Sequence, residues 1–232
     1  PYYMINDLSL LLYYIQKYEP NLKYDLVWVD TGTQNFSKLY PIMTDRFHFD
    51  KILSLPTFSN NRGEEGIPRV YELTVNLCEK SSYIMYFEDD FQLISTPKIG
   101  FIQNSIDILN RSTHKLMGLM LRNDLKREGR HKMLTVQIDN ETFNIELQLS
   151  RVYQFNNGAS IYRMSNIKEL YKNGIMKNKN AMYEIEMSNS ARDLGFFYGF
   201  VNFNTNCTIS RNNYCYGIFN HIGKFSSRLI KQ

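Results

Sequence analysis

The chain has 232 residues, of which 43% are hydrophobic and 22% are charged, and its formal net charge is +4. This composition predicts a folded globular protein with a hydrophobic core and only a mild preference for anionic ligands. No apolar run approaches the roughly 20 residues that cross a bilayer. No signal peptide is visible either, so no membrane segment is expected in this chain.

The distribution of basic residues and of cysteines argues against a nucleic-acid site and against a cysteine-based metal site or disulfide framework. The basic segment 126–132 is predicted to be a solvated loop, so no nucleic-acid partner is expected. Cys78, Cys207 and Cys215 form neither a metal-binding nor a disulfide framework. Cys207 and Cys215 are compatible with a bond across a hairpin and equally with two free thiols.

The first half of the chain predicts alternating helices and strands. In "DLSLLLYYIQK" apolar residues recur at helical spacing, with Asp7 in position to cap the helix. The run "YDLVWVD" is typical of a strand, and it ends at turn residues that begin with Asp30. In chain order, the predicted elements are a helix over 7–17, a strand over 24–30, a polar loop over 60–66, a helix over 67–80 and a strand over 82–90.

The second half predicts a different pattern. "KLMGLML" is typical of a buried strand, and two alternating runs flank residues 139–141 as the strands of an antiparallel hairpin do. The predicted elements are a strand over 115–121, hairpin strands over 134–138 and 143–149, a helix over 165–173, a helix that ends near Gly195 and a loop-rich last third. Phe196, Phe197, Tyr198 and Trp28 are predicted core residues.

The order of elements predicts an α/β fold. Repeated strand, loop and helix units favour a mostly parallel central sheet with helices on both faces, and residues 134–149 add a small antiparallel hairpin. The sequence shows no internal repeat and no linker, so we expect a single domain over 1–232 whose two halves share one sheet.

Three consecutive carboxylates end the apolar run "YIMYFEDD". Glu88, Asp89 and Asp90 repel one another, and desolvating them costs several kcal/mol, by order of magnitude, unless a cation or hydrogen-bond donors compensate. Ligands bind outside the carboxyl ends of strands in open α/β sheets, and Asp30 occupies a second such end. Carboxylate oxygens suit Mg²⁺ or Mn²⁺, so the triplet predicts a metal and diphosphate site. The alternative is that these carboxylates face solvent or cap the next element.

Six segments in order resemble one family. "YDLVWVDTGT", "NNRGEEG" and "YIMYFEDD" are similar to the nucleotide-binding half of glycosyltransferases with the GT-A fold, whose acidic signature is Asp-x-Asp or Glu-Asp-Asp. "NGASIYRMSNI" and "YEIEMSNSARDLGF" resemble their acceptor loop and catalytic-base segment. "NHIGKFSSR" is similar to the tail of N-glycan-branching GlcNAc-transferases. The resemblance extends from about residue 3 to residue 228.

The resemblance implies a donor site in residues 1–115. Asp30 would hydrogen-bond the uracil or ribose of the donor, and Asn61 and Arg62 would lie near the nucleotide and its diphosphate. Asp90 would be the metal ligand, Asp89 would contact the ribose or sugar, and Glu88 would support both.

The resemblance also implies an acceptor half over 116–232. Glu184 falls where the base carboxylate stands, and Glu186 falls two residues later at a position that is often acidic. His221 would contact the metal or the diphosphate from the C-terminal side. The family's usual base is an aspartate, whereas both candidates here are glutamates. Because Glu184 and Glu186 are two residues apart, either of them could occupy the position of the base.

The residue types also allow non-catalytic roles. Asp30 could cap a turn, Glu184 and Glu186 could form an exposed helix face, and His221 could be a hydrogen-bonded loop histidine. The family's first β-strand should precede residue 1, so we expect the chain to begin just after that strand.

The sequence predicts a glycosyltransferase that uses Mn²⁺ or Mg²⁺. It would transfer a sugar from a nucleoside-diphosphate sugar to a hydroxyl of a glycan or other acceptor, and a UDP-sugar is the preferred donor. Glu184 would act as the base, and the reaction would invert the anomeric configuration. A retaining reaction stays open, because the sequence does not fix the position of the carboxylate relative to the sugar. The alternatives from other classes are a non-catalytic sugar-binding domain of the same fold and a sugar nucleotidyltransferase. The sequence leaves the compartment open between the cytoplasm and a secretory lumen.

Overall fold

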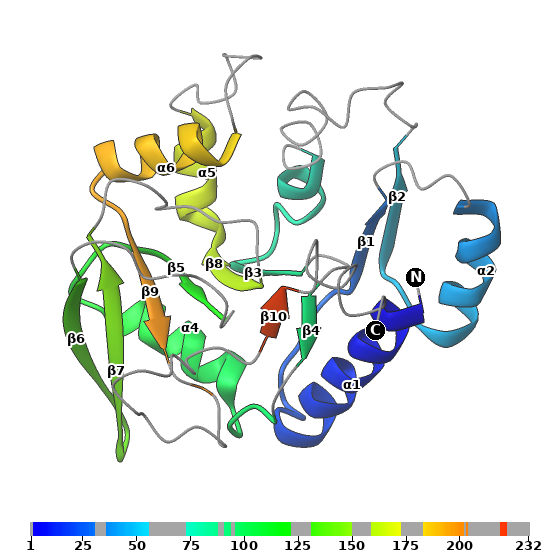
Figure 1. The fold of residues 1–232 in the computed structure, drawn as a ribbon, viewed down its shortest axis with the longest axis horizontal. Coiled ribbons are helices and arrows are strands. Elements are labelled where there is room, and N and C mark those ends of the chain that lie inside the picture. The colour runs from blue at the N-terminus through cyan, green and yellow to red at the C-terminus, as the bar shows by residue number, and fades with distance from the viewer. Residues whose placement is uncertain are drawn as a thin grey trace, which may run out of the picture.

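The computed structural model is a mixed α/β structure with one six-stranded sheet and two two-stranded sheets (Figure 1). The structure describes residues 2–30, 36–55, 73–87, 91–93, 96–121, 131–149, 159–172, 183–201, 203 and 219–221.

The N-terminal part consists of two helices and a parallel pair of strands. The predicted first helix is confirmed as α1 (Tyr2–Tyr18), but it begins earlier, so Asp7 lies inside the helix and is not its cap. The predicted strand is confirmed as β1 (Val27–Asp30). The sequence analysis missed α2 (Phe36–Arg46) and β2 (Lys51–Ser54), which pairs with β1 in parallel.

The middle of the chain contributes three strands and two helical segments before the hairpin. Residues 73–77 are helical, in agreement with the helix predicted over 67–80, whose earlier residues lie outside the described part. β3 (Tyr83–Tyr86) and β5 (Leu116–Met120) confirm two predicted strands. β4 (Phe91–Leu93) and α4 (Phe101–Arg111) were not predicted as separate elements.

The C-terminal half completes the large sheet. The predicted hairpin is confirmed as β6 (His131–Ile138) and β7 (Glu141–Gln148), and Asp139 in the turn has a φ of 50°. The helices α5 (Met164–Lys172) and α6 (Tyr183–Asp193) match their predictions. The last third is not merely loop, because it contains β9 (Phe197–Val201) and β10 (Phe219–His221). β8 (Ser160–Arg163) precedes α5.

The prediction of a mostly parallel central sheet is wrong. The six-stranded sheet has the order β3-β8-β5-β9-β7-β6, and β5–β9 is the single parallel pair among its described strands. β1 and β2 form a separate sheet, and so do β4 and β10. A short apolar run carries no sign of its direction, and β8 enters between β3 and β5 antiparallel to both.

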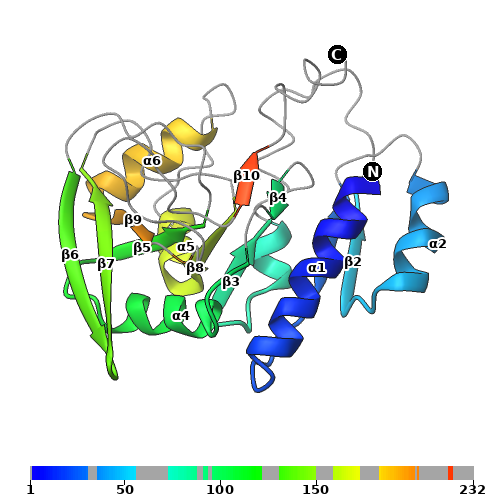
Figure 2. The same ribbon diagram turned by 60° about the horizontal axis from the view of Figure 1, so that its bottom comes forward.

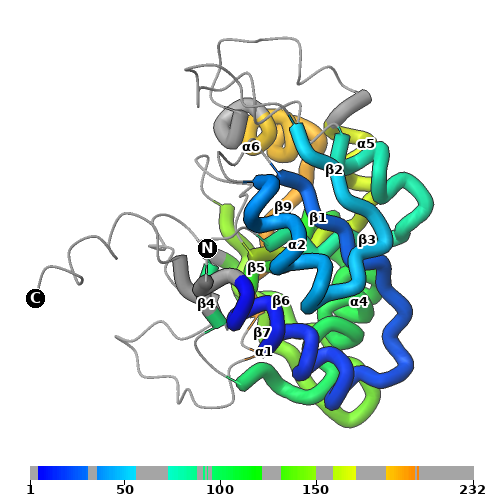
Figure 3. Tube along the Cα trace, turned by 90° about the vertical axis from the view of Figure 1, so that its right-hand side faces the viewer, coloured from blue at the N-terminus to red at the C-terminus, as the bar shows by residue number. Residues whose placement is uncertain are grey.

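Helices cover both faces of the six-stranded sheet, as predicted (Figure 2). α4 and α1 belong to the core cluster on one face, and α5 and α6 belong to the cluster on the other. A third cluster joins α1, α2 and β1 around Met43 and Phe47 at the end of the molecule that faces the viewer in Figure 3. Phe196 and Tyr198 are buried in the core, as predicted, whereas Trp28 is half-buried against Phe36 and Phe49.

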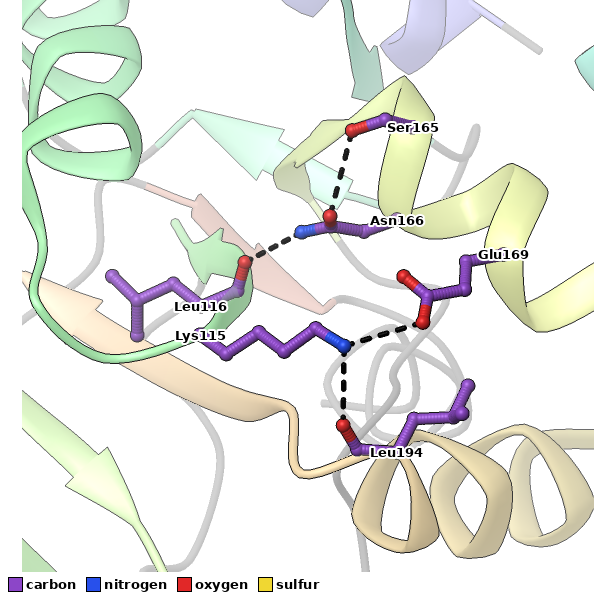
Figure 4. Close-up of polar contacts among 6 residues, drawn as sticks. All are labelled: Lys115, Leu116, Ser165, Asn166, Glu169 and Leu194. Atoms are coloured by element: carbon purple, nitrogen blue, oxygen red, sulfur yellow. Dashed lines mark hydrogen bonds and ion pairs between the residues drawn. The ribbon is translucent and has the colours of Figure 1, made fainter.

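A polar cluster fixes α5 and α6 against the start of β5 (Figure 4). The Lys115 ammonium donates to Glu169 Oε1 and to the Leu194 carbonyl, both at 3.2 Å, while Asn166 Nδ2 donates to the Leu116 carbonyl at 2.7 Å. α6 ends as predicted near Gly195, whose φ of 74° suits glycine.

No helix in the described ranges combines the length and the apolar composition that a membrane crossing requires.

Candidate functional site

The carboxyl ends of three strands lie at one edge of the six-stranded sheet. β3, β5 and β9 run in the same direction, because β8 is antiparallel to both β3 and β5, and β5 is parallel to β9. A continuous row of cross-strand partners marks this edge: Tyr86, Ser160, Met120, Phe200 and Glu146. The segment with the acidic triplet leaves the sheet at this edge, where α/β proteins commonly bind ligands.

The pairing of β4 with β10 brings two distant predicted site segments together. His221 is the Cα partner of Phe91, the residue bonded directly to Asp90 (β10 and β4 lie side by side in Figure 1). Antiparallel Cα partners lie about 4.5–5.5 Å apart, so the backbone of His221 lies beside that of Phe91, the residue that follows the triplet in the chain. The triplet itself and the His221 side chain are outside the described part of the structure.

Asp30 occupies the carboxyl end of a strand, as predicted. It is the last residue of β1 and is only 4% exposed. Its Oδ2 accepts a 3.3 Å hydrogen bond from Ser54 Oγ, and its carbonyl accepts the Leu55 N–H at 3.0 Å. These bonds fix the end of β1 to β2, which also fits the alternative of a turn-capping role. Contact of Asp30 with a nucleotide stays a prediction.

The two candidate bases occupy different faces of α6. Residues three, four and seven apart share a helix face. Position 184 therefore shares a face with Met187, Ser188 and Ala191, all of which are buried. Position 186 shares a face with residues that are half-buried or exposed, namely Asn189, Ser190 and Asp193. The backbone thus directs position 184 toward the sheet, although the side chains of Glu184 and Glu186 are outside the described part.

The remaining predicted site residues cannot be placed. Asn61, Arg62, Glu88, Asp89 and Asp90 lie outside the described residues. Within the described residues, no three His, Cys, Asp or Glu side chains gather into a group that could hold a metal ion. Of the cysteines, Cys78 is a half-buried free thiol whose pKa is raised by burial, and Cys207 and Cys215 are outside the described ranges.

Sequence reasoning missed the buried carboxylate of Glu146. It is 8% exposed and lies opposite Phe200, so its side chain is on the α6 face of the sheet. The alternation in "FNIELQL" does indicate the face of Glu146, because the alternate residues Phe143, Ile145 and Leu147 belong to the cluster on the opposite face of the sheet. Alternation alone predicts solvent exposure there, and the burial depends on tertiary neighbours such as Phe200 of β9.

A second missed carboxylate contacts the strand that follows the triplet. Asp7 of α1 is 9% exposed and accepts a hydrogen bond from the backbone N–H of Leu93 in β4. Burial raises the pKa of Asp7, and this hydrogen bond opposes the shift. The periodicity of "DLSLLLYYIQK" did show that position 7 lies on a helix, but not that it contacts β4.

No protein-family model matches the chain, and neither does any curated protein.

Proposed function

We propose that this protein is a metal-dependent glycosyltransferase that uses a nucleoside-diphosphate sugar as donor, with a UDP-sugar as the preferred donor. The observation that carries the proposal is the β4–β10 register, which places His221 beside Phe91, the residue after the acidic triplet, although more than half of the chain separates them. The Asp90 carboxylate and the His221 imidazole would supply a suitable ligand pair for a divalent cation.

The donor set fits Mn²⁺ or Mg²⁺. Asp90 would supply carboxylate oxygen, the ligand that both ions prefer, and the His221 imidazole gives Mn²⁺ the advantage, because Mg²⁺ takes oxygen ligands. When bound, the ion neutralises charge that develops on the departing diphosphate. Glu88 and Asp89 would fix the ribose and the sugar beside it.

The nucleotide would lie toward β1. The Asp30 carboxylate would accept a hydrogen bond from the uracil or ribose. Arg62 would donate charge-assisted bonds to the diphosphate oxygens, and Asn61 would lie beside it. These predicted roles derive from the resemblance to GT-A glycosyltransferases and are supported by the place of Asp30 at a strand's carboxyl end.

Glu184 is the preferred base over Glu186. A base must reach the acceptor hydroxyl within hydrogen-bond distance, and position 184 shares the inward face of α6 with Met187 and Ala191. Glu184 would take the proton of the acceptor hydroxyl as the oxygen attacks the anomeric carbon. The bond to the diphosphate breaks as the new glycosidic bond forms, and a single displacement of this kind inverts the anomeric configuration.

Calorimetric binding tests the proposal. UDP, UDP-glucose, UDP-GlcNAc and UDP-galactose are titrated with and without Mn²⁺ into the wild type, Asp90→Asn and the control Asp193→Asn. The control makes the same change in an exposed carboxylate at the end of α6. We expect Mn²⁺-dependent binding that Asp90→Asn abolishes and Asp193→Asn retains.

The alternatives give different outcomes in the same system. A folded protein that binds none of these nucleotides would overturn the proposal. Binding of a sugar without any transfer to water or acceptor would indicate a non-catalytic binding domain. Release of pyrophosphate from a nucleoside triphosphate and a sugar phosphate would indicate a nucleotidyltransferase.

A further inference from the structure

The strand pair β4–β10 is too small to be stable without support. β4 and β10 have three residues each, and they pair only with one another among the described strands. An isolated two-stranded ribbon is marginally stable at best in water. The relative position of His221 and Phe91 therefore depends on what packs against this ribbon.

α1 supplies the support along its length. Phe91 and Leu93, both buried, belong to the same core cluster as Leu11 and Ile15 of α1. Beyond β4, the Tyr14 hydroxyl lies 3.3 Å from Thr96 Oγ1.

Asp7 makes a hydrogen bond across the interface between α1 and β4. Its carboxylate accepts the backbone N–H of Leu93, a donor that a two-stranded ribbon cannot satisfy on its outer edge. Apolar packing allows a strand to slide, whereas a hydrogen bond to one backbone N–H fixes its position along the helix. Burial of the carboxylate opposes its charged form, so keeping Asp7 at this place is costly without the bond.

We propose that Asp7 is a positioning residue for the metal site: it fixes β4, and with it the paired strand β10, which carries His221. Asp7 acts through the backbone of β4 and is not itself a ligand. This inference rests on the proposed function, because it assigns to Asp7 a part in the same site.

Glu19 provides a matched control. It is also a buried carboxylate, 7% exposed, just after the end of α1, and burial raises its pKa as well. It accepts backbone N–H bonds from Ile102 at 2.9 Å and Gln103 at 2.8 Å, so it supports α4 rather than β4. A merely structural role for Asp7 predicts the same behaviour for both residues.

The test compares Asp7→Ala, Asp7→Asn and Glu19→Ala with the wild type. Mn²⁺ affinity is measured by calorimetry, and amide hydrogen exchange of residues 91–93 and 219–221 is measured without metal, both at a temperature where every variant is folded. We expect Asp7→Ala to bind Mn²⁺ at least tenfold more weakly and to exchange faster in both strands. Asp7→Asn keeps an acceptor oxygen and should recover most of the affinity, whereas Glu19→Ala should stay within about twofold of the wild type.

Two results separate the possible failures. If the wild type binds Mn²⁺ and Asp7→Ala binds it equally well, or if Glu19→Ala loses as much affinity as Asp7→Ala, the positioning role is wrong and the proposed function stands. If the wild type binds no Mn²⁺, the proposed function fails and the role of Asp7 fails with it. If Asp7→Ala does not fold, Asp7→Asn decides: Mn²⁺ affinity and ribbon exchange that both stay close to the wild type support the proposal, and a loss of affinity without faster exchange in the ribbon contradicts it.

Discussion

The Glu19 side chain, just after the end of α1, caps the first turn of α4. The N-cap of α4 is Gly100, which has no side chain to accept the first backbone N–H groups of that helix. Glu19 accepts two of them, from Ile102 and Gln103, and the Asn104 N–H bonds to the Gly100 carbonyl at 2.7 Å. A carboxylate at this place also complements the positive end of the helix dipole.

Replacing Glu19 by glutamine should destabilise the protein. The amide has one acceptor oxygen, so one buried N–H of α4 is left without a partner, at a cost of about 1–3 kcal/mol in the free energy of unfolding. Urea denaturation at neutral pH measures this loss. Glu141→Gln, which alters an exposed glutamate, is the control and should leave the midpoint unchanged.

The pH dependence of the same variant has a defined sign. Burial raises the pKa of Glu19 in the folded state above its ordinary value of 4.5. Its protonation therefore favours folding: this contribution is complete below about pH 4.5 and is lost as the pH rises through the folded-state pKa. Glutamine does not titrate, so the difference in stability between wild type and Glu19→Gln should be larger at pH 4 than at pH 7. An unchanged difference would contradict the raised pKa.

The two candidate bases make a second prediction at the residue scale. Glu184→Gln should lower kcat by about 10²–10⁴-fold, the usual contribution of a general base, because it removes the proton acceptor. Glu186→Gln should leave kcat close to the wild-type value, since position 186 lies on the outer face of α6. Steady-state kinetics with the donor identified by calorimetry provides the measurement. A larger loss in Glu186→Gln would reverse the assignment.

At the scale of elements, a few polar contacts decide how the α5–α6 layer sits on the sheet. Asn166 is 9% exposed and donates to the carbonyl of Leu116 at the start of β5, while Lys115 bridges α5 and the end of α6 (Figure 4). The Lys115 ammonium also lies 4.2 Å from the centroid of the Phe196 ring. These bonds orient α6, and with it position 184, relative to β5.

The cluster predicts unequal effects for neighbouring residues. Asn166→Ala removes the donor from a buried carbonyl and should lower the free energy of unfolding by about 1–3 kcal/mol. Ser165→Ala should change it by less than about 0.5 kcal/mol, because Ser165 is exposed and its contact with Asn166 is long, at 3.5 Å. Thermal and urea unfolding of both variants provide the comparison. Equal effects would show that the Asn166 bond to Leu116 contributes nothing specific.

At the scale of the whole molecule, the proposed site draws on segments from both halves of the chain. β3, β5 and β9 direct their carboxyl ends to one edge, and β10 returns from the C-terminal region to pair with β4. A ligand that contacts all of these segments binds only the folded state, so it should stabilise the protein as a whole.

Ligand binding should therefore raise the melting temperature. UDP with Mn²⁺ at 100 times its dissociation constant adds about 2.7 kcal/mol of stability, which for a chain of this size shifts Tm by about 5–10 °C. Differential scanning calorimetry with and without a chelator measures the shift. Asp90→Asn should show none, and an equal shift in this variant would place the nucleotide elsewhere.

The sequence predicted those elements whose signal is local. The hairpin β6–β7 followed from alternation around a short turn, and the end of α6 followed from Gly195. α2 was missed, and it carries Pro41 in its interior, a residue that sequence rules treat as a helix breaker. β4 was missed because three residues give too short a pattern to separate from the preceding strand.

The candidate site was less predictable than the fold. The position of Asp30 at a strand's carboxyl end could be read from the turn residues that follow it. The pairing of His221 with Phe91 could not be derived from the residues themselves, because it joins strands that are far apart in the chain. The burial of Asp7 and Glu146 likewise depends on neighbours that no local pattern identifies.

The sequence by itself determined α1, α5, α6, the hairpin β6–β7 and the strands β1, β3 and β5, because backbone hydrogen bonding and side-chain periodicity repeat over a few residues. Only the tertiary structure decided the direction of the strands, the separation of β1 and β2 from the large sheet, and the contacts of Asp7 and Glu19 with distant backbone groups. The physical reason is sequence separation. Glu19 and Ile102 are 83 residues apart, and a contact across that distance depends on how every element between them packs.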